Sequence, residues 1–151
     1  MGVVLIDVKK IRPLRNLVLR PNLPIETIFY DLDFHIDTIH LAFINNNRVV
    51  SIGTFYPEND LELKSKNGFR LRGMATHPDF IRNSYASKLM NESIKLLQDK
   101  KCDVIWCNAR LIAIDFYKSL GFLTIGPRRY GFSSDGGILA TMAGMPNGCL
   151  S

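Results

Sequence analysis

The sequence has few cysteines and no long apolar run, which argues against a disulfide-rich protein and against a membrane-spanning protein. The three cysteines, Cys102, Cys107 and Cys149, are odd in number and show no CxxC spacing. We therefore predict neither a disulfide framework nor a metal site, and we expect a reducing, cytoplasmic setting. The apolar segment from Gly2 to Ile6 is too short to cross a bilayer, and charged residues follow it directly. We expect no signal peptide, no transmembrane helix and no membrane partner.

Internal repeats, low-complexity tracts and linkers are also missing. The 151 residues are 46% hydrophobic and 22% charged, a composition typical of globular proteins. We expect one domain over residues 1–151 that buries roughly two thirds of the surface of the unfolded chain. The net charge of +5 is spread along the chain, without a basic stripe among aromatic residues. The positive net charge favours some anionic partner, but the lack of a basic stripe argues against a nucleic acid.

The hydrophobic periodicity predicts an α+β fold, because antiparallel strands lead into strand–helix–strand units. Strands are predicted over Val3–Val8, Thr38–Ile44, Arg48–Tyr56, Phe69–Thr76, Val104–Asn108, Phe122–Ile125 and Ile138–Met142. Helices are predicted over Lys9–Leu19, with Pro13 in its first turn, and over Ser84–Leu97 and Leu111–Leu120, the last capped by Gly121. We also expect a hairpin turn with positive φ at Asn45–Asn47 and a Gly- and Ser-rich turn at Ser133–Gly137.

The turn between the strand ending at Thr76 and the next helix contains no glycine from Ile81 to Ser87. A strand, a tight turn and a helix start present free backbone N–H groups that can bind a pyrophosphate, and Arg82 adds a cation. Taken alone, the turn is more simply explained by Ser84 acting as a helix N-cap. A serine can also replace a glycine in a phosphate-binding turn if its φ is negative.

A second motif is the helix that carries Tyr117. This tyrosine shares an apolar face with Ala113 and Phe116, so we expect its hydroxyl to point toward the sheet, where it needs a hydrogen-bond partner. A lone tyrosine on such a face is more often a core residue than a proton donor. Cys107 lies in an apolar strand and is expected to be a small buried residue without a nucleophilic role.

Together, the two motifs resemble the GCN5-related N-acetyltransferases (GNAT). LRGMAT before the turn, SKLM after it and the later FYKSLGF are similar to that family's motifs. On the family's Gln/Arg-x-x-Gly-x-Gly/Ala turn, Ile81 takes the first position, Ser84 the first glycine position and Ala86 the last position. The resemblance implies a central twisted mixed sheet of six to seven strands flanked by helices. Splayed central strands would form the acetyl-coenzyme A cleft.

The resemblance also implies an activity and a set of site residues. Acetyl-coenzyme A would be the co-substrate, and a primary amine of a small molecule or protein would attack the thioester directly. Tyr117 would act as general acid to the departing thiolate. The coenzyme would be bound by residues of the strand end, the turn and the tyrosine helix, namely Met74, Ala75, Thr76, Arg82, Asn83, Ser84, Tyr85, Ala86, Ser87, Asn108, Ala113 and Phe116. A bulge at Met74–Thr76 would supply the N–H group that holds the acyl carbonyl.

The residues leave several choices open. By chemistry alone the base is one of His40, Asp37, Glu58 and His77, and the identity of the acceptor and the occurrence of a homodimer are undecided. Arg70 and Arg72 alternate along one strand, which indicates a solvated face or an acceptor site for an acidic substrate. The alternative to an enzyme is a non-catalytic GNAT-fold module that binds coenzyme A or regulates a partner.

Overall fold

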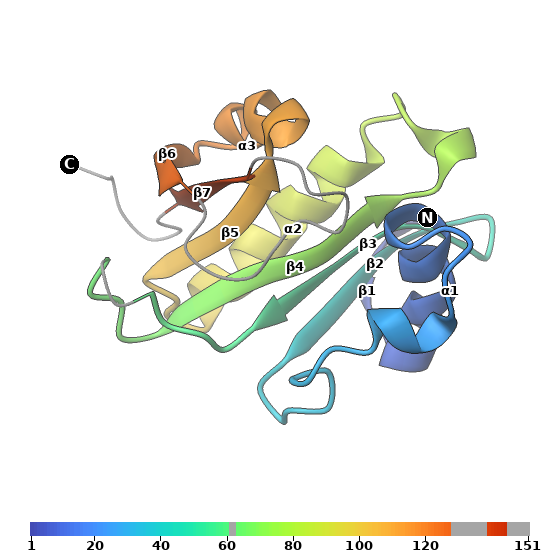
Figure 1. Ribbon diagram of the computed structural model, residues 1–151, viewed down its shortest axis with the longest axis horizontal. Helices are drawn as coiled ribbons and strands as arrows, with labels where there is room; N and C mark the ends of the chain where they lie inside the picture. Colours follow the sequence, from blue (N-terminus) through green and yellow to red (C-terminus); the bar gives the residue numbers. More distant parts are fainter. Residues whose placement is uncertain (61–62, 128–138, 145–151) are drawn as a thin grey trace. The chain divides into compact units, whose positions relative to one another are not determined.

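The computed structural model describes residues 1–60, 63–127 and 139–144 (Figure 1). Its strands are β1 (Gly2–Leu5), β2 (Ile39–Asn45), β3 (Arg48–Tyr56), β4 (Gly68–Thr76), β5 (Val104–Arg110), β6 (Leu123–Pro127) and β7 (Leu139–Gly144). Its α-helices are α1 (Val8–Leu19), α2 (Tyr85–Asp99) and α3 (Ile114–Ser119), and short 3₁₀ helices span Ile25–Ile28, Pro78–Phe80 and Leu111–Ala113. None of the helices in these residues is long and apolar enough to cross a membrane.

The strands form a seven-stranded sheet in the order β1-β2-β3-β4-β5-β7-β6. The pairs β1–β2, β2–β3, β5–β7 and β6–β7 are antiparallel, whereas β4 and β5 are parallel over three residue pairs, from Gly68–Val104 to Arg70–Trp106. The predicted α+β class with a mixed sheet flanked by helices is therefore confirmed.

Two compact units make up the described chain. Unit 1 contains residues 1–56 and 71–93, and unit 2 contains residues 57–70 and the described residues from 94 onward. The division passes through β4 and α2, so it is not a boundary between consecutive domains. The expectation of a single domain stays a prediction.

The core of unit 1 lies between α1 and the sheet. Ile11 and Leu14 of α1 pack with Ala42 of β2, Ile52 of β3 and Ala75 of β4. Burying an aliphatic side chain of this size contributes about 1.5–3 kcal/mol. This contact fixes the helix over the strands that carry the polar residues described below.

Helix α1 begins earlier than the sequence suggested. Asp7 is its N-cap, and the Asp7 carboxylate accepts a hydrogen bond from the Lys9 N–H group at 2.7 Å. Pro13 consequently lies inside the helix, in its second turn, so its predicted place in the first turn was wrong. The missing N–H of Pro13 leaves the carbonyl of Lys9 without its usual helical donor.

Unit 2 is built around Trp106 of β5. This side chain is fully buried with Val104 and Ala143, and its indole N–H donates to the Glu58 carbonyl at 2.9 Å. Gly144 makes close packing possible here, because a Cβ at that position would lie 3.0 Å from the ring of Phe122. The tyrosine helix α3 ends at Ser119, and Gly121 follows its C-cap residue with a φ of 92°, which confirms the predicted cap.

Most element predictions agree with the structure. Strand β3 has the predicted bounds, and Asn46 and Asn47 have positive φ in the hairpin that precedes it. The predicted helix over Leu111–Leu120 is instead a 3₁₀ turn followed by the short α3. The turn predicted at Ser133–Gly137 and the residue Cys149 lie outside the described residues.

Candidate active site

The glycine-free turn of unit 1 adopts a conformation that glycine favours. Arg82 has a φ of 73° and Ser84 a φ of 61°. A left-handed conformation costs a non-glycine residue roughly 1–2 kcal/mol. The condition given for Ser84, a negative φ, is therefore not met: the serine takes the conformation that a glycine would have.

The turn leads directly into α2. The Ser84 carbonyl accepts from the Lys88 N–H at 3.0 Å, so Ser84 occupies the N-cap position. The N–H groups of the next residues have no acceptor within the helix. The first turn of α2 contains no acidic residue, and Arg82, Asn83 and Ser84 are exposed. An anion at this helix start would meet N–H donors and no carboxylate from the first turn of α2.

Two side chains predicted to contact the coenzyme from the end of β4 are used elsewhere. Ala75 is buried in the unit 1 core, and the hydroxyl of Thr76 is hydrogen-bonded to that of Ser51 at 2.9 Å. Met74, which precedes them, is half-buried. A ligand at the end of β4 would therefore contact the backbone of this stretch more than the side chains of Ala75 and Thr76.

Tyr85, another predicted contact, is also held in place. Its ring stacks on Phe43 with centroids 4.7 Å apart, and its hydroxyl accepts from the Asn45 amide at 3.0 Å. Ala86 and Ser87 are half-buried on the same first turn of α2. Tyr85 thus anchors the helix start to β2, and its side chain is engaged within unit 1.

Strand β4 departs from extended geometry at Gly73, directly before the stretch predicted to bulge. Gly73 has a φ of 67°, and a Cβ there would lie 3.0 Å from Nε of Arg15. Both the conformation and the close approach require glycine. An isolated glycine in a strand often marks such a bulge, and this signal was available in the sequence.

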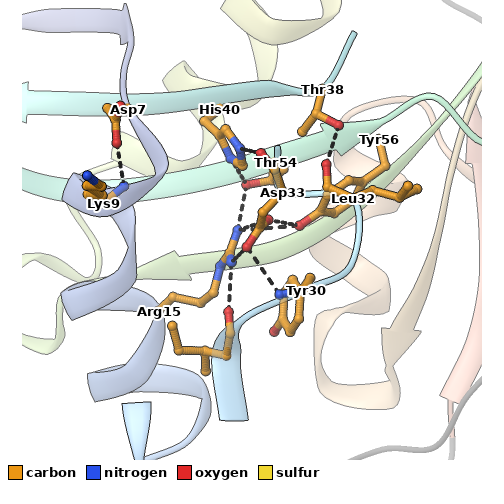
Figure 2. A network of polar contacts seen from close by, with 11 residues as sticks. Asp7, Lys9, Arg15, Tyr30, Leu32, Asp33, Thr38, His40, Thr54 and Tyr56 are labelled. Atoms are coloured by element: carbon orange, nitrogen blue, oxygen red, sulfur yellow. Dashed lines mark hydrogen bonds and ion pairs between the residues drawn. The ribbon is translucent and has the colours of Figure 1, made fainter. Parts of the chain in front are cut away.

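Arg15 belongs to a buried polar network in unit 1 (Figure 2). Its guanidinium donates to both carboxylate oxygens of Asp33, at 2.8 and 3.3 Å, and the exposed fraction of both side chains is 0%. It also donates to Thr54 Oγ1 at 3.0 Å, while the Tyr56 hydroxyl donates to Asp33 at 2.5 Å. Burial raises the pKa of Asp33, but the bonds from Arg15 and Tyr56 outweigh it, and the net shift is downward.

His40 closes this network and is thereby removed from the candidate bases. Nε2 of His40 faces the carbonyl of Asp33 at 2.9 Å and so must donate, while Nδ1 accepts from the hydroxyl of Thr54 at 2.9 Å. Burial lowers the pKa of His40, which agrees with a neutral ring. With both nitrogens engaged, His40 has no free lone pair for a substrate proton.

The other candidate bases lie in simpler surroundings. Glu58 forms an ion pair with Arg70 at 3.6 Å in unit 2. In unit 1, His77 is the N-cap of a 3₁₀ helix and accepts from the Asp79 N–H, and Asp37 is exposed. Among the described residues, no three His, Cys, Asp or Glu side chains lie close enough together to hold a metal ion.

Tyr117 is buried in unit 2 and is hydrogen-bonded to the thiol of Cys107. Burial raises the pKa of Tyr117 well above its ordinary value and that of Cys107 to about 12. Both groups therefore stay protonated at neutral pH. The expected burial of Cys107 is confirmed, but its contact with the tyrosine was missed, because no local pattern joins a β5 thiol to an α3 hydroxyl.

The remaining predicted residues lie in unit 2, in or near the elements that carry Cys107 and Tyr117. The Phe116 ring meets that of Tyr117 edge-on at 5.2 Å, and Ala113 is the N-cap residue of α3. The Asn108 carbonyl oxygen accepts from the Thr141 hydroxyl at 3.0 Å, which ties β5 to β7. Unit 2 thus gathers Asn108, Ala113, Phe116 and Tyr117 on β5 and the segment that follows it.

Comparisons with known proteins agree with these features. Residues 8–122 match the family described as "Acetyltransferase (GNAT) family". The chain is 30% identical over 121 residues to the uncharacterized N-acetyltransferase YitI of Bacillus subtilis (strain 168), covering 80% of this chain and 81% of the relative.

Solved structures share the fold at low sequence identity. An aminoglycoside 6'-N-acetyltransferase from Enterococcus faecium has a TM-score of 0.73 at 14% identity, with 97% of each chain covered. The ribosomal-protein-S18-alanine N-acetyltransferase from Escherichia coli has a TM-score of 0.70 at 18% identity, covering 94% of this chain and 91% of that one. The match over most of its length shows that this chain belongs to the GNAT family of acetyltransferases, whose co-substrate is acetyl-coenzyme A.

Proposed function

We propose that the chain is an N-acetyltransferase that moves an acetyl group from acetyl-coenzyme A to a primary amine by direct attack, with Tyr117 as general acid to the departing thiolate. The observation that carries the proposal is the state of Tyr117. Its hydroxyl is buried and forms a side-chain hydrogen bond with the thiol of Cys107, and burial raises its pKa, so the phenol keeps its proton at neutral pH. A hydroxyl can rotate about its C–O bond, so the same proton can be offered to a second sulfur.

The raised pKa of Tyr117 has two opposite effects. It keeps the proton on the phenol throughout the neutral range, so the acid is always in its active form. It also makes the phenol a weaker acid than a thiol with an ordinary pKa of about 8.5, so the proton moves only as charge develops on the leaving sulfur. No covalent enzyme intermediate is needed, which is consistent with the protonated state of Cys107.

The turn of unit 1 fits the pyrophosphate of the coenzyme. Positive φ at Arg82 and Ser84 points successive N–H groups to one side, as in backbone nests that bind anions. The α2 N-terminus adds its dipole, and the Arg82 guanidinium adds a full charge. Arg82 to Ser87 are therefore proposed to bind the phosphates mainly through their backbone, since the Tyr85 side chain is already engaged.

The acyl and pantetheine contacts are proposed from each unit separately. In unit 1, the positive φ of Gly73 interrupts the extended geometry of β4 directly before Met74–Thr76. An N–H group of that stretch would then hold the acyl carbonyl. In unit 2, Asn108, Ala113 and Phe116 would line the arm of the coenzyme. That β4 and β5 part to form a cleft for it stays a prediction.

Calorimetry with acetyl-coenzyme A and a thiol-release assay with a panel of primary amines test the proposal. Tyr117→Phe should lower kcat about 10²- to 10⁴-fold, because a general acid is lost, and should leave the Kd for acetyl-coenzyme A nearly unchanged. Tyr56→Phe is a comparison variant that also removes a buried phenol hydroxyl, but from the unit 1 network, so it should change stability and the KM for the acceptor without the large loss of kcat.

The outcomes separate the alternatives. If kcat of Tyr117→Phe equals that of the unaltered protein across pH, Tyr117 is not the acid. If acetyl-coenzyme A binds but no amine in the panel is acetylated, the chain is a non-catalytic coenzyme-binding module. If neither heat nor thermal stabilisation is seen at high coenzyme concentration, the proposed function is wrong.

A further inference from the structure

Arg72 of β4 carries a charge that no described residue neutralises. Its side chain is exposed, and its guanidinium lies over the ring of Tyr30, 4.0 Å from the centroid. No ion pair joins it to an acidic side chain within residues 1–60, 63–127 and 139–144. By contrast, Arg70 in unit 2 has the carboxylate of Glu58 as its partner.

Tyr30 is a firmly held platform for this guanidinium. Its backbone N–H donates to Asp33 Oδ2 at 3.2 Å, and its ring packs edge-on against Tyr56 at 6.5 Å. The guanidinium of Arg15 also lies 4.4 Å from the centroid of the same ring. The buried network of Figure 2 therefore holds Tyr30 in position, and the Tyr30 ring in turn supports the guanidinium of Arg72.

The two guanidiniums on this ring differ in net charge. The charge of Arg15 is offset by Asp33, whose carboxylate it contacts twice. The charge of Arg72, the second guanidinium on the Tyr30 ring, is not offset by a carboxylate of the described residues, and its side chain is exposed to solvent. A stacked guanidinium keeps most of its N–H donors free, in a planar fork that matches a carboxylate.

The position of Arg72 in the chain connects it to the proposed chemistry. It directly precedes Gly73 and Met74, where the strand geometry changes and where the acyl carbonyl is proposed to be held. We propose that Arg72, stacked on Tyr30, binds a carboxylate of the acceptor, so that the preferred substrates are amines that also carry a carboxylate group. This inference rests on the proposed function and adds a substrate class to it.

The test uses pairs of amines that differ only in the anion. Glycine, β-alanine, aspartate and glutamate are each compared with the fully amidated form by thiol release. For the carboxylated member, Arg72→Met should raise KM about 10- to 100-fold, the value of a charge-assisted pair of hydrogen bonds. For the amidated member, KM and kcat should stay unchanged.

Three further variants separate charge from stacking. Arg72→Lys should restore part of the preference, because it keeps the charge but loses the planar fork. Tyr30→Leu should raise KM for the carboxylated amine only about two- to fivefold, the worth of an exposed cation–π contact. Arg12→Met is the matched control: its guanidinium also stacks on a ring, that of Phe29 at 3.8 Å, but from α1 instead of β4.

The results that overturn this inference differ from those that overturn the proposed function. If the unaltered enzyme acetylates both members of each pair equally, or Arg72→Met affects both equally, the carboxylate preference is wrong and the acetyltransferase proposal stands. If no amine is acetylated, calorimetry with the carboxylated amines decides: no binding, or binding unchanged by Arg72→Met, refutes the role of Arg72.

Discussion

The two units bury polar groups in opposite ways. Unit 1 encloses a full ion pair, Arg15 with Asp33. The oxygens of Asp33 and the two terminal guanidinium nitrogens of Arg15 are bonded to neighbours from β2, β3 and the intervening segment, whereas Nε of Arg15 has no hydrogen-bond partner among the described residues. Unit 2 encloses a neutral pair, the Cys107 thiol and the Tyr117 hydroxyl, among aromatic rings. A buried ion pair depends on its partners to offset desolvation, whereas a neutral pair depends on keeping its protons.

This difference suits the two proposed roles. The ion pair fixes the loop that carries Tyr30, so a rigid arrangement supports the guanidinium of Arg72. The neutral pair keeps a transferable proton in a low-dielectric setting, where a proton donor can respond to charge that develops nearby. Positioning therefore belongs to unit 1 and proton donation to unit 2 in the proposed mechanism.

The largest expected effect comes from leaving the Arg15 charge without its partner. Asp33→Asn keeps the size of the side chain but removes the negative charge, so a buried guanidinium remains uncompensated. The free energy of unfolding should fall by about 3–5 kcal/mol, measured by urea denaturation.

The double variant Arg15→Met/Asp33→Asn should be less destabilised than Asp33→Asn alone, because the stranded charge is gone. If the free energy of unfolding of Asp33→Asn is within about 1 kcal/mol of that of the unaltered protein, the ion pair is solvated in solution. The contrast between the two units would then disappear.

A smaller effect should appear in the pH dependence of stability, with opposite signs for the two units. The pKa of Cys107 is raised to about 12 and that of Cys102 to about 11. Above pH about 9 the unfolded thiols ionise while the folded ones stay protonated, so stability falls by up to about 1.4 kcal/mol per pH unit for each group. Tyr117 adds to this loss only above pH about 10, where Tyr56 of unit 1 contributes as well, so the contrast between the units applies below that pH.

On the acid side the loss belongs to unit 1. The pKa values of His40 and Asp33 are lowered on folding, so stability declines as pH falls below about 6.5 and further below about 3.9. Urea titrations from about pH 3 to about pH 10 would separate the two limbs. Cys107→Ala should flatten the alkaline limb and leave the acid limb unchanged; an equal change in both would refute the assignment.

The sequence predicts the secondary structure well where a local pattern determines it. Strand β3 has the predicted bounds because three asparagines fix its start and regular apolar residues fix its length. Pro13 misled the prediction of α1, since the preference of proline for a first turn gave way to the Asp7 cap and the core contacts of Ile11.

The candidate site could be predicted only in part. Its segments and Tyr117 follow from motifs, but the partners do not, because Arg15 and Asp33 are 18 residues apart and come from different elements. Arg15 does follow Ile11 at helical spacing, a sign that it faces the core, yet nothing in the sequence identifies its acid. The positive φ of Ser84 was likewise hidden, because serine usually avoids that conformation and only the glycine of the family motif pointed to it.

The smallest effect should come from the second ion pair, Arg70 with Glu58, which belongs to unit 2. Its atoms are 3.6 Å apart, and the Glu58 side chain is 33% exposed. Arg70 also lies over the ring of Trp106, 5.2 Å from the centroid, so it keeps a contact when the carboxylate is lost. Glu58→Gln should therefore lower the free energy of unfolding by about 1 kcal/mol or less. A loss as large as that of Asp33→Asn would mean that exposure does not govern the worth of an ion pair in this protein, and that unit 2 also depends on a fixed charge.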